Sequence, residues 1–170
     1  AALEQLLTPQ KETADFANTE SLLREAAYDT GAVGDLQAWW LHRMHYTANP
    51  LTEKLTLFWH NHFATSFSKV QSVPHMAAQN DRFRAEALGS FRELLHAMAK
   101  DVAMLIWLDS NANRKRHANE NFAREVMELF SLGEGNYTED DIKQAARAFT
   151  GWHVRDDKFW FNQRQHDITS

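Results

Sequence analysis

The sequence predicts an all-α protein, an irregular bundle of about six to eight helices with one short strand near the C-terminus. Apolar residues recur with the 3.6-residue period of a helix along most of the chain. Helix-breaking residues are scarce, with 6 Gly and 3 Pro. Several segments also begin with a capping residue and end at a glycine, as helices do.

The composition favours one folded helical domain over residues 1–170. The chain is long enough to bury a core, and 44% of its residues are apolar, with 6 Trp and 11 Phe. No apolar run approaches the ~18 residues that a membrane-spanning helix needs, and no signal peptide is expected at the start. The chain stops without a terminating motif, so we expect it to be part of a larger protein.

Start and stop signals divide the first hundred residues into helices. The expected helices are one capped by Thr19 that runs to about Asp29, one capped by Asp35 that carries Leu36, Trp39, Trp40 and Met44, one from Asn49-Pro50 to about Phe63, and a long one from near Pro74 to Lys100 with Gly89 at a close-packing point. Trp39 and Trp40 cannot face the same side of one helix, so one of them is expected to cover a neighbouring element or groove.

Shorter elements are expected in the rest of the chain. They are a helix from Asp101 through Leu108, a loop over Asp109–Ala118, a helix from the Asn119 cap to Gly133, a helix from the capping box Thr138-Glu139-Asp140-Asp141 to Gly151, and a strand at Lys158–Phe161.

Composition also excludes several kinds of chemistry. The chain has no cysteine, which rules out disulfides, thiolate chemistry and Cys-based zinc sites. Its formal charge of −5 argues against a nucleic-acid partner. Arg114-Lys115-Arg116 is the only basic run, and three charges in a loop are more often solvated than used to grip a phosphate. No nucleophile elbow or phosphate-binding glycine loop occurs.

The segment Asn119–Phe130 carries an unusually dense group of polar side chains for one helix. On a helical wheel its apolar residues fill one arc, and Arg124, Glu128, Asn121 and Glu125 fill the opposite arc. Two interpretations remain open. The polar arc is either a solvated stripe with ion pairs of about 0.3–0.5 kcal/mol each, or a carboxylate site that a second layer of protein covers.

The segment Phe58–Phe63 contains two histidines, His60 and His62. Residues two apart on a helix point about 200° apart, so these two cannot hold one ion while both are helical. His62 falls on the apolar side of the wheel and is expected to be a hydrogen-bonded core residue. His60 falls on the side of Glu53 and Thr56 and is the better candidate for acid–base chemistry.

The Glu-x-x-His spacing of carboxylate di-iron bundles occurs once, at Glu93-Leu94-Leu95-His96. With Glu53, Glu125 and Glu128, a four-helix di-iron site can be drawn. That pattern needs two Glu-x-x-His motifs, however, and the second one is missing.

The loop before Asn119 carries oxygen donors in the order of a calcium loop. Asp109, Asn111, Asn113 and Glu120 fall at positions 1, 3, 5 and 12 of the template, but Arg114 stands where the template needs glycine. The alternative is an Asx-rich loop that hydrogen-bonds its own backbone and caps the next helix.

Long motifs run along the chain from about Pro50 onward. They are Leu57–Phe63, Ala87–Leu95, Leu108-Asp109, Asn119–Gly133, Gly135–Glu139 and Ala146–Trp152. With these motifs the chain resembles the bacterial domain-of-unknown-function 1800 family over about residues 50–167. The first 49 residues resemble the family less distinctly.

The resemblance implies a longer, exported bacterial protein. Family members are usually much longer, and His166-Asp167 resembles a pair that they carry further along, so completing groups are expected outside this chain. Many members resemble exported proteins, which implies a periplasmic or extracellular location. Their genes often neighbour those of an uncharacterised family with sulfatase-like character, so another exported protein encoded nearby is an expected partner. No reaction comes with the family.

The family's motifs hold more polar residues than packing needs, and we expect one cleft where the helices of His60, Asn119 and Arg147 meet. The first functional hypothesis is an exported enzyme, hydrolytic or redox, with a divalent metal ion as its candidate cofactor. Its expected catalytic residues are His60, Glu125, Glu128, Arg124 and Arg147, its substrate-binding residues Asn119, Asn121 and Trp152, and its metal ligands His60, Asp109 and Glu120.

The rival hypothesis is a non-catalytic helical scaffold or partner-binding module of a secreted assembly. The charged cluster would then be a buried network that fixes the register of the helices. Trp39 or Trp40 would lie on a contact surface.

Overall fold

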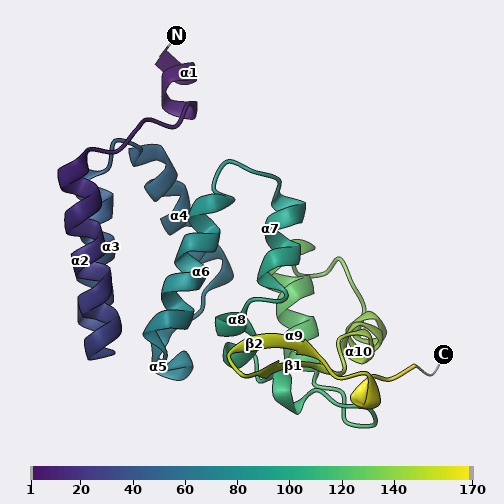
Figure 1. The fold of residues 1–170 in the computed structure, drawn as a ribbon. Coiled ribbons are helices and arrows are strands. Elements are labelled where there is room, and N and C mark those ends of the chain that lie inside the picture. Colours follow the sequence, from purple (N-terminus) through teal and green to yellow (C-terminus); the bar gives the residue numbers. More distant parts are fainter. Residues whose placement is uncertain (1, 169–170) are drawn as a thin grey trace.

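The computed structural model describes residues 2–168 and is mainly helical, with a two-stranded antiparallel hairpin near the C-terminus (Figure 1). The elements, in chain order, are α1 (Ala2–Leu7), α2 (Ala14–Thr30), α3 (Val33–Tyr46), α4 (Pro50–Phe63), α5 (Phe67–Val70), α6 (Val73–Ala85), α7 (Phe91–Met98), α8 (Val102–Trp107), the short 3-10 helix η1 (Ser110–Ala112), α9 (Glu120–Glu125), the π-helix η2 (Val126–Ser131), α10 (Glu139–Ala148), β1 (Trp152–Arg155), β2 (Lys158–Phe161) and the 3-10 helix η3 (Gln163–Gln165). The predicted all-α class and the predicted strand are confirmed.

The helices lie roughly in chain order from one end of the molecule to the other. In Figure 1, α2 and α3 lie side by side at one end, α4 and α6 lie beside them, and α7 to α10 with the hairpin form the other end. The helix α1 extends away from the rest at the top of the view. Within residues 2–168, no helix is both long and apolar enough to cross a membrane.

Two predicted helix starts in the first half are wrong. The helix α2 starts at Ala14 because the hydroxyl of Thr13 accepts the Phe16 backbone N–H over 3.2 Å, so Thr19 lies inside the helix. The helix α3 starts at Val33, and Asp35 lies in its first turn. A carboxylate interacts favourably with the helix dipole both at the N-cap and in the first turn. The sequence therefore does not readily distinguish these two positions for Asp35.

The long helix predicted from Pro74 to Lys100 is also wrong, because the chain turns between α6 and α7. The backbone N–H of Gly89 donates to the carbonyl of Glu86 over 2.9 Å and closes that turn. A Cβ at Gly89 would lie 3.3 Å from the same carbonyl oxygen. The glycine therefore marks a tight turn instead of a packing point inside a helix.

Other predicted boundaries are confirmed. Asp101 caps α8 by accepting the Met104 N–H over 2.9 Å, and Asn119 caps α9 by accepting the Asn121 N–H over 3.0 Å. The capping box at Thr138 is formed. What the sequence did not indicate is that α9 continues as a π-helix, a geometry that often occurs at functional sites.

The largest core cluster lies between α4, α6, α7, α8, α9 and η2. Its buried residues are Phe63, Phe83, Leu94, Met98, Met104, Leu105, Leu108, Phe122 and Phe130. The rings of Phe63 and Phe83 stack with centroids 5.7 Å apart and join α4 to α6. This packing holds α4 in place, and α4 carries His60.

Candidate functional site

A pocket of about 230 Å³ opens between α3, α4, the start of α5 and α6. Its lining is mostly apolar and aromatic, with a few polar groups, as is usual for sites that bind small molecules. The lining residues are Val33, Leu36, Gln37, Trp39, Trp40, His60, Thr65, Ser66, Phe67, Met76 and Asn80.

His60 is the titratable group of this pocket. Its ring packs edge-on against Trp40, with centroids 5.4 Å apart, and against Phe83 at 6.1 Å. Within residues 2–168, neither ring nitrogen of His60 has a hydrogen-bond partner. Burial lowers the pKa of His60 below the usual 6.5, because the charged imidazolium loses contact with water. His60 is therefore neutral at pH 7 and can accept a proton.

Three other polar side chains of the pocket are already bonded. Thr65 donates its hydroxyl hydrogen bond to Gln79, the Ser66 hydroxyl bonds to Ser68 over 2.9 Å, and the Asn80 side chain accepts from Arg84. Ser66 and His60 line the same pocket without a hydrogen bond between them, so the described residues contain no Ser–His pair here.

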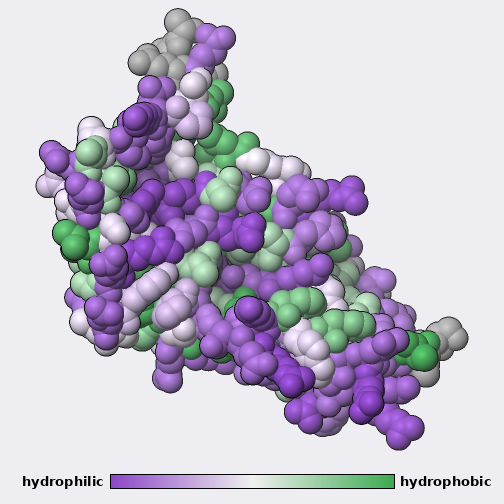
Figure 2. Space-filling view, in the orientation of Figure 1, coloured by the Kyte–Doolittle hydropathy of each residue, from purple (hydrophilic) through white to green (hydrophobic). Residues whose placement is uncertain are grey.

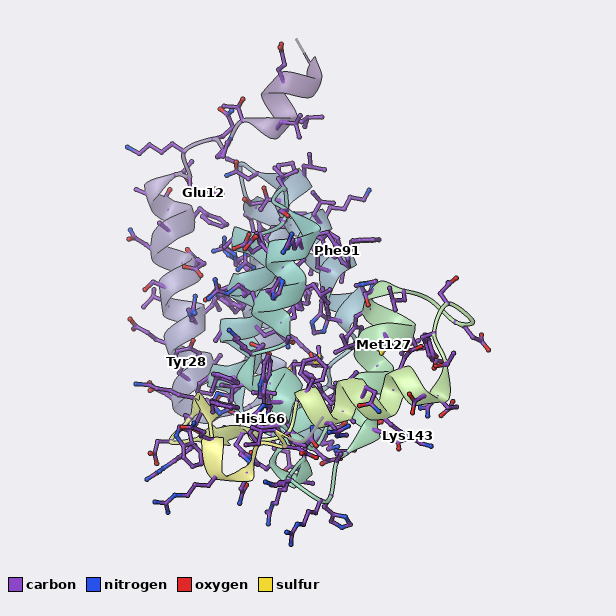
Figure 3. All side chains as sticks on the ribbon, turned by 90° about the vertical axis from the view of Figure 1, so that its right-hand side faces the viewer. Glu12, Tyr28, Phe91, Met127, Lys143 and His166 are labelled. Carbon is purple, nitrogen blue, oxygen red and sulfur yellow. The ribbon has the colours of Figure 1, made fainter. Side chains whose placement is uncertain are left out.

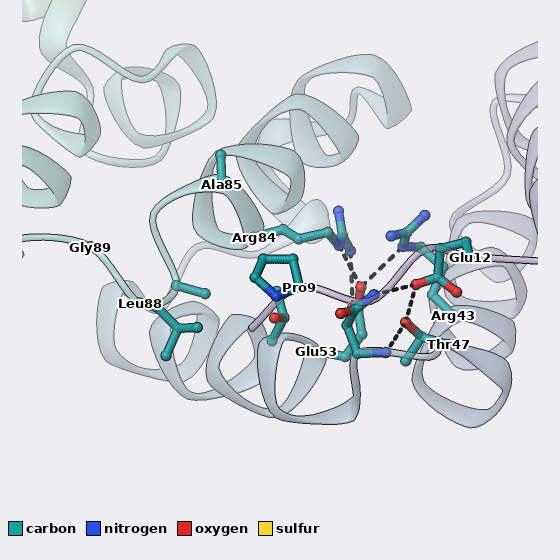
Figure 4. A pocket seen from close by; sticks show the side chains of 12 residues that line it. Pro9, Glu12, Arg43, Thr47, Glu53, Arg84, Ala85, Leu88 and Gly89 are labelled. Carbon is teal, nitrogen blue, oxygen red and sulfur yellow. Dashed lines mark hydrogen bonds and ion pairs between the residues drawn. The ribbon is translucent and has the colours of Figure 1, made fainter. Parts of the chain in front are cut away.

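A buried ionic network lies directly behind this pocket. The carboxylate of Glu53 is 2% exposed and accepts hydrogen bonds from Arg43 over 3.1 Å, from Arg84 over 2.5 and 3.0 Å, and from the indole of Trp40 over 3.1 Å (Figure 4). Burial pushes the pKa of Glu53 up, but its hydrogen bonds and the charges of the two arginines outweigh burial and hold the pKa below its usual value. Glu53 is therefore ionised.

The network extends around the fully buried ring of Trp39. Trp39 donates its indole N–H to Glu20 over 2.7 Å, and the guanidinium groups of Arg24, Arg43 and Arg84 lie 5.3–5.8 Å from the centre of its ring. Such cation–π contacts contribute about 0.5–2 kcal/mol each. The network thus joins α2, α3, α4 and α6 around one tryptophan.

The sequence reasoning missed Arg43 and Arg84 as partners of Glu53. One signal was available, because the wheel places Glu53, Thr56 and His60 on one side of α4. That side is the one turned inward, with Glu53 and Thr56 buried, while Phe58 on the opposite side is 55% exposed. A polar helix face that is buried requires charged partners on the next helix.

A second pocket, of about 320 Å³, lies on the other side of the network (Figure 4). Glu12 lies at its edge and accepts hydrogen bonds from Thr47 over 2.6 Å, from Asn49 over 2.8 Å and from the backbone of Ala48 over 2.9 Å. Burial by itself raises the pKa of Glu12, but these hydrogen bonds outweigh burial and hold the pKa below its usual value. Glu12 therefore fastens the chain before α2 to the turn between α3 and α4.

The predicted carboxylate site on α9 lies on the surface. Arg124 forms a bidentate ion pair with Glu139 of α10, over 3.0 and 2.8 Å, and lies 3.7 Å from Glu120. Glu128 accepts a hydrogen bond from the hydroxyl of Tyr137 over 2.5 Å. The side chain of Glu139 is 68% exposed, so no second protein layer covers this pair in the described residues.

Glu125 is the remaining carboxylate of this arc. It is half-buried, and burial together with the neighbouring charge of Glu128 raises its pKa. Asn121 is exposed, and Asn119 donates from its side chain to the carbonyls of Leu108 and Asp109, each over 3.3 Å. The described part of the arc therefore matches the solvated interpretation more closely than the covered one.

The side chains of the calcium-loop template have other partners, which favours the alternative of an Asx-rich loop. Asn113 is fully buried, accepts the Asn119 backbone N–H over 2.9 Å and donates to the carbonyl of Ala146 over 3.1 Å. Asn111 accepts from the Val154 N–H over 2.7 Å, and Asp109 pairs with Lys69. These side chains bond backbone and a cation, as an Asx-rich loop does.

The metal ligands and the di-iron set are not brought together either. Among residues 2–168, no group of three or more His, Asp or Glu side chains could hold a metal ion. His60 faces Trp40 and Phe83, Asp109 pairs with Lys69, and Glu120 lies beside Arg124. In the di-iron drawing, Glu53 belongs to the arginine network, and Glu93 and His96 are exposed.

His62 is hydrogen-bonded, as predicted. Its Nε2 donates to the carbonyl of Phe130 over 3.1 Å. Phe130 belongs to the π-helix η2, so this bond connects the motif of α4 with the motif that starts at Asn119. The two motifs therefore meet through His62 and not through His60.

Arg147 and Trp152 lie at the base of the C-terminal segment. Arg147 pairs with Asp167 over 3.3 Å and bonds Gln144 over 2.7 Å, and His166 donates to the carbonyl of Thr150 over 2.8 Å. The half-buried Trp152 packs against Phe122, Phe149 and Phe159. Among the described residues, His60, Arg124 and Arg147 have different neighbours, so these contacts do not bring the three side chains into the expected single cleft.

The comparison with protein families agrees with the motifs. The model for the protein family of unknown function DUF1800 matches residues 1–170, so the match also includes the first 49 residues, where the motifs were indistinct. Neither a curated protein nor a solved structure matches the chain. The chain belongs to the DUF1800 family.

Proposed function

We propose that this chain binds a small, mainly apolar molecule in the pocket between α3, α4, α5 and α6, and that His60 is the acid–base group of the reaction there. The observation that carries the proposal is the state of His60. It is a neutral imidazole with no hydrogen-bond partner among residues 2–168, and it lines an aromatic pocket of about 230 Å³. A strained or perturbed titratable group in a cleft is a candidate for function.

The chemistry follows from the neutral ring. A ring nitrogen accepts a proton from a bound hydroxyl group or from water and becomes imidazolium, and it returns the proton to the leaving group. The rings of Trp40 and Phe83 pack against His60, and the partial burial of His60 favours its neutral form. Because the chain resembles family members that look exported, we favour a hydrolytic enzyme that acts outside the cytoplasm.

The proposal is tested by nuclear magnetic resonance on the imidazole Cε1–H signals. His60 is assigned with His60→Gln, and phenol and benzamide serve as neutral aromatic probes. We expect His60 to titrate below 6.5 and its signal to shift when either probe is added. The matched control is His96→Gln, because His96 is exposed on α7.

Two results decide whether the pocket of His60 binds the probes as proposed. Loss of probe binding in His60→Gln, with normal binding in His96→Gln and unchanged circular dichroism in both, supports the pocket. A His60 signal that titrates at the ordinary value and ignores both probes contradicts it.

A second candidate function, the partner-binding module, is favoured by an exposed apolar face. Phe58 is 55%, Phe91 40% and Leu129 55% exposed, and the ring of His62 lies between Phe58 and Phe91, at 6.4 and 5.9 Å. An apolar face of this kind often marks a protein contact. It should bind the dye anilinonaphthalene sulfonate in the native state, and Phe58→Ser should reduce that binding whereas Leu22→Ser on α2 should not.

A further inference from the structure

We propose that the C-terminal hairpin end of the molecule binds the anionic headgroups of a phospholipid membrane. The surface, called here the basic hairpin surface, is formed by Arg114, Lys115, Arg116, Arg155, Lys158 and Arg164. These six side chains are exposed, although the chain as a whole carries a formal charge of −5. The proposal is independent of the pocket of His60.

Backbone contacts bring the three segments of this surface together. The backbone N–H of Lys115 donates to the carbonyl of Gln165 over 2.7 Å, which places the Arg114–Arg116 loop beside η3. Asn111 holds the same loop to the hairpin, because its side chain accepts the Val154 N–H over 2.7 Å. Cations that are distant in sequence therefore form one surface.

Among the described residues, most cations of this surface form no ion pair, although the exposed Asp156 and Asp157 lie in the hairpin turn between Arg155 and Lys158. Within residues 2–168, only Arg155 of the six forms an ion pair, with the neighbouring Asp156 over 3.5 Å. The buried arginines of the network differ, since Arg43 and Arg84 each pair with Glu53. A cation that has no partner within the protein is available to an external anion.

Exposed aromatic side chains lie at the same end. Trp160 is 38% exposed on the hairpin face that also carries Arg155 and Lys158, and the guanidinium of Arg155 lies 5.1 Å from the centre of its ring. Phe161 is 42% exposed on the opposite face of the hairpin from Trp160. Aromatic side chains among lysines and arginines are typical of a membrane interface, where the ring enters the headgroup layer and the cations meet lipid phosphates.

The pictures agree with this arrangement. In Figure 3, nitrogen-tipped side chains point away from the molecule at the bottom, beside the segment that carries His166. Figure 2 shows hydrophilic residues, a class that includes both acidic and basic side chains, over the lower right part of the molecule, where Figure 1 places α10, the hairpin and the C-terminal segment.

A membrane fits this surface better than a long anionic polymer does. The neighbouring segment from α9 to α10 is strongly acidic, with Glu120, Glu125, Glu128, Glu134, Glu139, Asp140 and Asp141. A nucleic acid or polysaccharide that extended past the hairpin would meet these carboxylates. A membrane surface can contact the hairpin end alone, without contacting the acidic segment from α9 to α10.

The test is co-sedimentation of the purified chain with vesicles of phosphatidylcholine, with and without phosphatidylglycerol. We expect binding only to vesicles with phosphatidylglycerol, and weaker binding at high salt because salt screens the charges. The double variant Lys115→Gln/Arg116→Gln should bind about thirtyfold more weakly. The control Lys54→Gln/Arg92→Gln removes the same charge from exposed cations of α4 and α7 and should bind like the parent chain.

Three outcomes overturn the proposal. They are no binding to phosphatidylglycerol vesicles at low salt, equal loss of binding in the two double variants, and binding to free poly-uridylate but not to vesicles, which would assign the surface to a polymer. Circular dichroism of each variant verifies that the fold is intact.

Discussion

Trp40 donates its indole hydrogen bond to Glu53 over 3.1 Å, and its ring lies nearly perpendicular to that of His60, with the centroids 5.4 Å apart. One side chain thus belongs to the buried ionic network and to the wall of the candidate pocket. The position of Trp40 in the pocket wall is therefore fixed in part by its hydrogen bond to Glu53.

Replacement of Glu53 by glutamine should lower the free energy of unfolding by up to about 3–5 kcal/mol, because Arg43 and Arg84 lose a buried carboxylate. Arg43 keeps its ion pair with Glu20 and Arg84 its ion pair with Asp81, and these pairs reduce the loss. Urea denaturation followed by circular dichroism measures the change. Glu134→Gln is the control, since Glu134 is exposed, and it should change stability by less than about 0.5 kcal/mol. Equal values for the two variants would show that the network does not hold the helices together.

Asp101 should make the protein less stable as the pH rises. Burial raises its pKa to about 6, against hydrogen bonds from the Met104 backbone and Gln79 that lower it. The folded state therefore binds more protons than the unfolded state between about pH 4 and 6, and stability falls as the pH rises through that window. Asp101→Asn keeps the helix cap without the charge, so it should stabilise the protein by about 3 kcal/mol at pH 8 and by less at pH 5. A gain that is the same at both pH values would contradict this account.

Removal of the Asn113 side chain tests the interpretation of the loop as a backbone-bonding loop. Asn113→Ala removes the acceptor of the Asn119 N–H and the donor to the Ala146 carbonyl, so two backbone groups lose their partners. We expect a loss of about 2–4 kcal/mol in thermal or urea unfolding. Asn61→Ala, at an exposed position of α4, should have almost no effect, and calcium should leave the melting temperature of the parent chain unchanged. Stabilisation by calcium would restore the metal interpretation.

Glu125 distinguishes a surface role from a catalytic one. Its pKa is raised by burial and by the charge of Glu128, so its ionised form is disfavoured in the fold. Glu125→Gln should therefore stabilise the chain slightly at pH 7, by about 0.5 kcal/mol or less, as expected when a like-charge pair on a helix is removed. Melting curves at pH 7 measure this. A marked loss of stability would mean that Glu125 has a partner that the solvated interpretation omits.

Local signals predicted the local structure well. The caps at Asp101, Asn119 and Thr138 were recognisable because a capping side chain bonds a backbone N–H only two or three residues away. His62 was placed correctly as a hydrogen-bonded residue because it falls on the apolar side of α4. The Pro74–Lys100 helix failed because helical propensity continues across Gly89, where the backbone turns.

The charged residues of the buried network were harder to predict, because their partners are distant in the chain. Glu53 and Arg84 are 31 positions apart, and Arg24 and Asp81 are 57 apart. The periodicity of the sequence does not indicate which distant residues form such an ion pair. The polar residues of α9 stood out in the sequence, yet they lie on the surface and pair with α10.

The sequence by itself determined the helical class, the caps of α8, α9 and α10, the strand β2 and the family, since these follow from periodicity, capping and motifs within short segments. Only the tertiary structure decided which polar residues are buried. The packing of α2, α3, α4 and α6 turned the side of α4 that carries Glu53 and His60 inward, and it left the Arg124 side of α9 in solvent. A charge acquires its pKa and its partners from the elements packed against it, and those elements meet only after the chain has folded.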